Sequence, residues 1–230
     1  MRYATLVSGG KDSCLAHHLA REDGFEPVAG IVIRPTDPDS HMFHVPNLDV
    51  AVAQVQALGL EPIELEAPPG KETETEILVD AFQAAHDRGA ETIVAGAVAS
   101  EYQRVRVERA AEEVGLKVHT PLWRKDPWQI LDLLVTGGYD VRFSTVAAYG
   151  FAEHWLGRRL DEDALEDLAD LEAAYGVHPI GEGGEYESLV LDAPGFQRRI
   201  DVLDTASTFQ RDRGEWSVTE HQLVDPDPPA

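Results

Sequence analysis

The residues that most plainly carry chemistry are Ser8-Gly9-Gly10-Lys11-Asp12-Ser13, which lie between an apolar run at Arg2–Val7 and a helical pattern at Asp12–Ala20. The two glycines let the backbone turn tightly and present N–H groups with no Cβ in the way. Amides at the start of a helix, together with the ammonium of Lys11, suit phosphate or pyrophosphate, and the serine hydroxyls add hydrogen bonds. The spacing is not that of the GxxxxGK[ST] loop, which holds a transferred γ-phosphate. A mere strand-to-helix turn needs neither the lysine nor both serines, so we predict that Ser8, Gly9, Gly10, Lys11, Asp12 and Ser13 bind phosphate.

Alternating strand-like and helix-like segments position this loop. Strands are predicted at Arg2–Val7, Phe25–Ile33, Pro62–Leu65 and Thr92–Ala97, and helices at Asp12–Ala20, Asn47–Leu58, Ile77–Arg88 and Tyr102–Val114. This rhythm is typical of an α/β fold with a parallel sheet and helices on both faces. Ligands of such sheets bind beyond the carboxyl ends of the strands, where the loop lies.

The rhythm changes after Pro121-Leu122-Trp123. Helices are predicted at Pro127–Val135 and Asp161–Tyr175, and strands at Asp140–Val146, Ser188–Leu191, Arg198–Leu203 and Trp216–Val224. We therefore expect a nucleotide-binding domain at residues 1–124 and a smaller α+β, substrate-binding domain at 125–224. The polar, proline-rich residues 225–230 are expected to form a disordered tail.

Several motifs together resemble one family. The SGGKDS loop resembles that of the PP-loop ATP pyrophosphatases, whose fold is the Rossmann-like adenine nucleotide alpha hydrolase type. Four further stretches are similar to the diphthine–ammonia ligase family: SHMFHVPN at 40–47, GAVASEYQRVRVE at 96–108, PLW at 121–123 and GEGGEYES at 181–188. The resemblance runs from about Arg2 to Pro194, and beyond it we find no motif.

The resemblance implies an activity. Members of the family amidate the carboxylate of diphthine, a modified histidine of translation elongation factor 2, with ATP and ammonium, and release AMP and pyrophosphate. ATP and magnesium are thus the implied cofactors, and elongation factor 2 bearing diphthine is the implied partner. Lys11 then stabilises the departing pyrophosphate, and Asp12 either holds magnesium or simply caps the helix.

The other motifs supply further candidates. Ser100, Gln103 and Arg104 follow the Thr92–Ala97 strand and are expected to contact the nucleotide, with Arg104 clamping a phosphate. Ser40 and His44 are expected in a loop around the nucleotide or diphthine, with a purely structural loop as the alternative. His41 and His44 lie three residues apart, but without further His or Cys at ligand spacing they predict no metal site. In the glycine loop we expect Gly183, Gly184 and Tyr186 to bind substrate and Glu185 and Glu187 to be catalytic. Carboxylates and an aromatic ring suit the quaternary ammonium of diphthine, although three carboxylates in a short loop are more often simply solvated.

Composition limits the alternatives. The chain of 230 residues carries 19 Lys and Arg against 42 Asp and Glu, a net charge of −23. This charge opposes direct binding to nucleic acid or to an anionic membrane, and a lysine-poor acidic surface suits a salt-adapted source. No apolar run reaches membrane-spanning length and no leader is apparent, so we expect a cytoplasmic protein. The single cysteine, Cys14, excludes an internal disulfide, a paired-cysteine metal site and a separate glutaminase nucleophile.

Two other functions remain open from the residues. One is a related ATP-pyrophosphatase amide ligase for a small carboxylic acid, and the other is a regulatory module that binds ATP or AMP without turnover. The intact SGGKDS loop favours an enzyme, because a sensor has no need to stabilise leaving pyrophosphate. A homo-oligomer is compatible with the sequence, which does not determine the oligomeric state.

Overall fold

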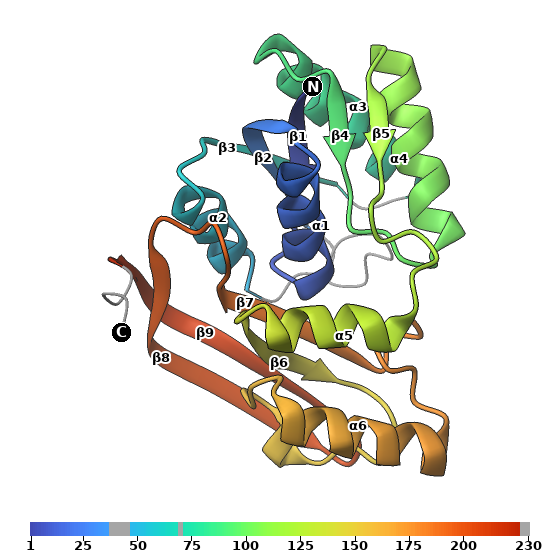
Figure 1. Cartoon of the computed structure of the whole chain (residues 1–230), viewed down its shortest axis with the longest axis vertical. Coiled ribbons are helices and arrows are strands. Elements are labelled where there is room, and N and C mark those ends of the chain that lie inside the picture. The colour runs from blue at the N-terminus through green and yellow to red at the C-terminus, as the bar shows by residue number, and fades with distance from the viewer. Residues whose placement is uncertain (37–46, 69–70, 226–230) are drawn as a thin grey trace. The chain divides into compact units, whose positions relative to one another are not determined.

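The computed structural model describes residues 1–36, 47–68 and 71–225. The chain divides into two compact units, Met1–Trp123 and Arg124–Ala230, each with its own sheet (Figure 1). Within the described ranges, no helix is both long enough and apolar enough to cross a membrane.

The first unit is built on a parallel sheet of five strands in the order β3-β2-β1-β4-β5. β1, β2 and β4 carry most of the buried strand residues, whereas β5 at one edge has none. The strand bounds are β1 (Arg2–Leu6), β2 (Glu26–Pro35), β3 (Pro62–Ala67), β4 (Thr92–Val94) and β5 (Lys117–His119). This is the predicted α/β architecture of Rossmann type.

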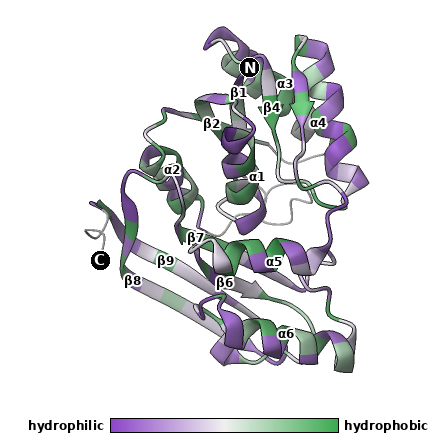
Figure 2. Ribbon diagram, viewed as in Figure 1, coloured by the Kyte–Doolittle hydropathy of each residue, from purple (hydrophilic) through white to green (hydrophobic). Residues whose placement is uncertain are grey.

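Helices cover both faces of this sheet. The bounds are α1 (Lys11–Glu22), α2 (Leu48–Ala57), α3 (Lys71–Asp87) and α4 (Glu101–Val114). α3 and α4 pack against the face that carries Ala29, Ile31 and Ile33 of β2, whereas α2 packs against Val32 on the opposite face. In α4 the buried residues Val107, Ala110 and Ala111 repeat at helical spacing, and Figure 2 shows hydrophilic and hydrophobic residues side by side on this helix.

α1 is fastened to β1 by a buried polar pair. The hydroxyl of Tyr3 lies 3.1 Å from Nδ1 of His17 and donates to the His17 carbonyl over 3.2 Å. Burial lowers the pKa of His17 to about 4, so the imidazole is neutral at neutral pH. The pair fixes the helix that carries the phosphate loop without placing a charge beneath it.

The second unit is an antiparallel sheet in the order β7-β6-β9-β8. Its elements are α5 (Pro127–Thr136), β6 (Asp140–Val146), a short 3-10 helix at Glu153–Trp155, α6 (Glu162–Tyr175), β7 (Tyr186–Asp192), β8 (Arg199–Gln210) and β9 (Arg213–Val224). An aromatic cluster forms part of its core: the Phe143 ring lies 4.8 Å from that of Trp155 and 5.0 Å from that of Tyr186, centre to centre. Such tilted and edge-on contacts are the arrangements that aromatic rings prefer.

The structure departs from the sequence prediction at several ends. The strand predicted at Thr92–Ala97 ends at Val94, and β5 was not predicted because three residues show no periodicity. α3 begins at Lys71, six residues before the predicted start, since Lys71–Glu76 contains no apolar residue to mark it. β8 continues to Gln210 instead of ending at Leu203, and residues 203–208 are exposed, so burial imposes no alternation there.

Candidate active site

The predicted phosphate loop lies where the strand order of the first sheet reverses. From β1 the chain moves to β2 and β3 on one side of the sheet, and then to β4 and β5 on the other. β1 and β4 are paired in parallel, so their carboxyl ends are neighbours. Ser8–Ser13 follows β1 and Gly96–Ser100 follows β4, which brings two segments far apart in sequence to the switch point at which such folds bind ligands.

Gly96 lets these two segments touch. A Cβ at this position would lie 2.6 Å from the carbonyl carbon of Asp12 and 2.6 Å from the backbone nitrogen of Ser13. Backbone cannot move aside as a flexible side chain can, so any other residue would displace the first turn of α1 or the loop after β4. Gly96, the first residue of the GAVASE stretch, therefore allows the loop after β4 to lie against the phosphate loop.

α1 starts without a side-chain cap. Its N-cap, Gly10, has no side chain, and Gly9 before it takes φ = +87°, which glycine adopts at no steric cost. By contrast, the N-caps of α4, α5 and α6 each accept a hydrogen bond from their own helix: Ser100, Asp126 and Asp161. The first backbone N–H groups of a helix have no partner within it, and their partial positive charge suits an anion.

The two serine hydroxyls maintain the shape of the turn. Ser13 is buried, and its Oγ donates to the Gly10 carbonyl over 3.0 Å. The same Oγ accepts from the Ser8 hydroxyl over 3.3 Å and lies 3.4 Å from the Ser8 nitrogen. The turn is thus preorganised by its own hydroxyls, and their predicted contact with phosphate stays a prediction.

Lys11 and Asp12 form a charged pair at the start of α1. Lys11 is only 3% exposed, and its Nζ donates to Oδ2 of Asp12 over 3.0 Å. Oδ1 of Asp12 is shielded from solvent and has no hydrogen-bond partner among the described residues. A shielded carboxylate oxygen of this kind fits a cation, and magnesium in proteins commonly takes one or two carboxylates together with substrate phosphates. No cluster of three or more His, Cys, Asp or Glu that could hold a metal occurs in residues 1–36, 47–68 and 71–225.

The loop after β4 is held largely by its own helix. Ser100 Oγ accepts from the backbone N–H of Gln103 over 3.3 Å, so this hydroxyl serves as the cap of α4. The Arg104 guanidinium donates to Glu101 over 2.8 Å and to Glu108 over 2.5 Å, and these carboxylates raise its pKa. It also lies 4.9 Å from the ring centre of Trp123. To clamp a phosphate as predicted, Arg104 would have to leave these partners, so its role stays a prediction, as does that of Gln103.

In the second unit, Glu185 holds the glycine loop together. Its Oε2 accepts from the Gly183 N–H over 2.8 Å, and its Oε1 accepts from the His178 N–H over 3.1 Å. A Cβ on Gly183 would lie 2.6 Å from the Glu185 carboxylate, so the glycine permits this approach. Both oxygens accept from backbone, so Glu185 stabilises the shape of the loop, and its predicted catalytic role stays a prediction.

Tyr186 is buried in the second unit, and its predicted contact with substrate stays a prediction. Tyr186 is 3% exposed, its ring packs on Phe143, and its hydroxyl donates to the Pro179 carbonyl over 2.6 Å. Its neighbour Glu187 points to the other face of β7 and is half-buried, opposite Thr145 of β6. Gly184 is exposed, with φ = +79°.

Exposed aromatic rings do occur next to this loop. Tyr149 and Tyr175 are 71% and 53% exposed, and their rings meet edge to face at 5.1 Å. Tyr149 comes two residues after Ala147, whose N–H donates to the Glu185 carbonyl over 2.7 Å. Sequence reasoning missed both rings because nothing in the local pattern separates an exposed tyrosine from a buried one.

Ser40 and His44 lie outside the described residues. Cys14 is half-buried in the first turn of α1.

The comparisons with known proteins cover almost the whole chain. The model of the diphthamide synthase N-terminal domain matches residues 1–118, and that of the diphthamide synthase C-terminal domain matches residues 126–224. The chain is 33% identical over 227 residues to the diphthine–ammonia ligase of Danio rerio, which covers 90% of this chain and 88% of that protein. The chain belongs to the diphthamide synthase family.

Other relatives are more distant or longer. The diphthine–ammonia ligase of Homo sapiens is 31% identical over 90% of this chain and 84% of its own length. That of Schizosaccharomyces pombe is 34% identical over 94% of this chain, which spans only 38% of that longer protein. A solved structure described as a predicted subunit of tRNA methyltransferase from Methanocaldococcus jannaschii covers 84% of this chain and 97% of its own, with a TM-score of 0.43 and 16% identity. At that score the likeness adds nothing to the family assignment.

In this diphthamide synthase family member, one residue that was not predicted from the sequence contacts the phosphate loop directly. Gln54 of α2 is 2% exposed, and its Nε2 donates to the Gly9 carbonyl over 2.8 Å. The available signal was a polar residue on the face of Asn47–Leu58 that also carries Ala51 and Val55. A buried amide on an apolar helix face needs partners, and here one partner is the loop.

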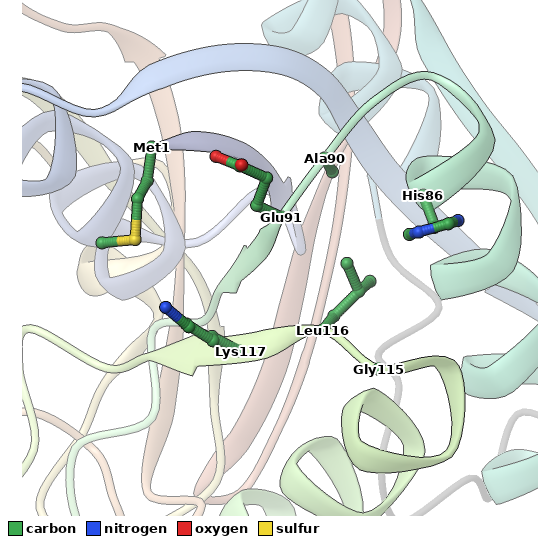
Figure 3. Close-up of a pocket in the computed structure, with 7 residues that line it drawn as sticks. All are labelled: Met1, His86, Ala90, Glu91, Gly115, Leu116 and Lys117. Carbon is green, nitrogen blue, oxygen red and sulfur yellow. The ribbon is translucent and has the colours of Figure 1, made fainter.

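A hollow of about 250 Å³ lies in the first unit, at the end of the sheet opposite the phosphate loop (Figure 3). It is lined by Met1, His86, Ala90, Glu91, Gly115, Leu116 and Lys117. Met1, Glu91 and Lys117 precede or begin β1, β4 and β5, so the hollow is at the amino ends of the strands. The phosphate loop follows the carboxyl end of β1, and the hollow is therefore no part of the candidate site.

Replacing Gly96 tests whether the two loops must touch. We expect Gly96→Ala to cost about 1–3 kcal/mol of stability, because the new methyl group overlaps backbone. Displacement of the first turn of α1 should also weaken ATP binding by at least about tenfold, as small misplacements at such sites are costly. Thermal melting and calorimetric titration with ATP measure the two effects.

Gly115→Ala is the control, since Gly115 closes α4 at φ = +81° and a Cβ added there would meet no atom within 4 Å. It should lower stability through backbone strain and leave ATP binding within about twofold of wild type. Equal ATP affinity in Gly96→Ala and wild type would contradict the contact.

Proposed function

We propose that this chain catalyses the ATP-dependent amidation of diphthine on translation elongation factor 2. The carboxylate of diphthine becomes the amide of diphthamide, ammonium supplies the nitrogen, and AMP and pyrophosphate are released. The observation that carries the proposal is the uncapped start of α1, with buried Lys11 and the unpartnered Oδ1 of Asp12, in a chain that the two diphthamide synthase models match almost throughout.

The first step activates a poor electrophile. An oxygen of the diphthine carboxylate attacks the α-phosphorus of ATP, and the bond from that phosphorus to the bridging oxygen of the β-phosphate breaks. The electron pair of that bond leaves with pyrophosphate, where negative charge develops. In this proposal Lys11 and the N–H groups at the start of α1 stabilise that charge, since groups held in a preformed turn stabilise a developing charge at little reorganisation cost.

Asp12 is the residue that would hold magnesium. Its Oδ2 is occupied by Lys11, which leaves Oδ1 to face the cation directly or through water. When bound, the ion would neutralise charge on the phosphates. With one carboxylate from the protein, its remaining ligands would be phosphate oxygens and water.

The second step forms the amide. Ammonium first gives up a proton, and the resulting ammonia attacks the acyl carbon of the adenylated diphthine. A second proton leaves the nitrogen as the acyl–oxygen bond breaks and AMP departs with that oxygen. Glu187, half-buried opposite Thr145 of β6, is our candidate for accepting a proton. The sequence has no cysteine besides Cys14 that could act as a glutaminase nucleophile, so we infer that ammonia comes from solution or from another protein.

The direct test measures AMP formation with ammonium and elongation factor 2 that carries either diphthine or unmodified histidine, at high and low salt. AMP and pyrophosphate that appear only with diphthine, together with the mass change of amidation, would support the proposal. AMP formed regardless of the protein added would indicate a small carboxylic acid as substrate. ATP binding without AMP under every condition would indicate a regulatory module.

Removal of the Lys11 ammonium should reduce catalysis strongly. We expect Lys11→Ala to lower the rate of pyrophosphate release by about 100- to 1,000-fold, since the charge on the leaving group loses its partner. Lys117→Ala is the matched control, an exposed lysine of the same unit that should leave the rate unchanged. Wild-type turnover by Lys11→Ala, measured by pyrophosphate release, would refute the assignment of the phosphate loop.

Glu187 should matter to the protein substrate and not to ATP. We expect Glu187→Gln to lower diphthine-dependent turnover by about 100-fold, because the neutral amide accepts no proton, while ATP affinity stays near wild type. Glu166→Gln, an exposed position on α6, is the control for loss of a carboxylate in the same unit. If the variant loses ATP affinity and turnover to the same degree, Glu187 has a structural role.

A further inference from the structure

The peptide between Gly9 and Gly10 has glycine on both sides. Gly9 has φ = +87°, and Gly10 has φ = −82° and ψ = 165°. Glycine populates positive and negative φ about equally, so no Cβ on either side opposes rotation of this peptide. Some other contact has to select its orientation.

That contact is the hydrogen bond from Gln54. Nε2 of Gln54 donates to the Gly9 carbonyl over 2.8 Å, and the side chain is 2% exposed. A trans peptide is planar, with its C=O and N–H pointing in opposite directions. Fixing the carbonyl toward α2 therefore aims the Gly10 N–H away from α2.

α2 is a firm support for this hydrogen bond. Val55, the residue after Gln54, packs with Ala51 against Val32 of β2. The packing depends on Gly30 of β2, where a Cβ would overlap the Val55 side chain. How closely α2 packs on the sheet thus determines how far the Gln54 amide extends toward the loop. At the observed packing, the amide contacts the Gly9 carbonyl.

The Gly10 amide has only a weak partner within the loop. Its N–H donates to Ser8 Oγ over 3.4 Å between nitrogen and oxygen, a long hydrogen bond that a phosphate oxygen can replace. In the opposite orientation the peptide would turn its carbonyl oxygen toward the phosphates, which its negative end repels. A rotation of one peptide therefore decides whether this position attracts or repels the anion.

We propose that Gln54 is a positioning residue that holds the Gly9–Gly10 peptide with its N–H toward the phosphates of the nucleotide. The inference rests on the proposed function only in that the loop binds the phosphates of ATP. Gln54 does not touch the reacting atoms, and it acts through the backbone of the loop.

The test uses the full chain and inorganic pyrophosphate as the probe, with ATP alongside. Gln54→Met keeps the length and shape of the side chain and removes the donor. We expect its affinity for pyrophosphate and ATP, measured by calorimetry, to fall by about tenfold or more. Gln56→Met makes the same change at an exposed position of α2 and should leave both affinities unchanged.

A second variant separates positioning from packing. Gln54→Glu presents a carboxylate to the Gly9 carbonyl at about pH 8 and repels it, whereas burial raises the pKa of such a group so that it is protonated and donates at about pH 5. Its pyrophosphate affinity relative to wild type at the same pH should therefore recover about fivefold or more as the pH falls. A purely structural role predicts lower melting temperatures with no such recovery.

The outcomes distinguish the inference from the proposed function. Wild-type affinity for pyrophosphate in Gln54→Met would overturn the inference, as would weakened affinity in both variants without recovery of Gln54→Glu at low pH. If Gln54→Met does not fold, the pH profile of Gln54→Glu decides alone. If the wild-type chain binds neither ATP nor pyrophosphate, the proposed function itself fails.

Discussion

The helix that begins at Lys11 starts without a side-chain cap, and much of the first unit is arranged to stabilise that start. The strand order places β1 at the middle of the sheet, so that the helix start faces the switch point. Gly96 lets the loop after β4 lie against the Asp12–Ser13 backbone, and Ser13 ties back the Gly10 carbonyl. The first N–H groups of an uncapped helix lack hydrogen-bond partners within the helix, which disfavours that start unless other contacts stabilise it. The contacts of Gly96 and Ser13 stabilise it here.

The α/β class and most elements of the fold could be predicted because buried strands and amphipathic helices imprint their periods on the sequence. The prediction failed where residues are polar or exposed, because such segments carry no apolar periodicity. The polar start of α3 at Lys71 and the exposed continuation of β8 to Gln210 carry no apolar period. The short β5 is specified by pairing with β4, a long-range contact that no local window contains.

The candidate site, like the fold, could be predicted only where the local sequence carries the signal. The SGGKDS loop was found because local chemistry and local structure coincide there, and the structure places it at the switch point. The contacts of Glu185 and Tyr186 could not be predicted from their spacing, because partners distant in sequence determine them. Glu185 is bound by the N–H of His178, and Tyr186 packs on Phe143 of β6. Gln54 was missed for the complementary reason, since its partner Gly9 lies on another element.

The net charge of the chain places one more constraint on the proposed nucleotide site. A chain of net charge −23 repels a polyanionic nucleotide at long range, so the attraction must come from groups within contact distance. Buried Lys11 and the uncapped start of α1 are the groups that the proposed nucleotide site would offer at such a distance. Salt shortens the range of the surface repulsion, from about 8 Å at physiological ionic strength to about 3 Å at 1 M, but it screens shielded contacts much less. An acidic surface and a nucleotide site are therefore compatible, provided that the site is preorganised and not assembled from mobile surface cations.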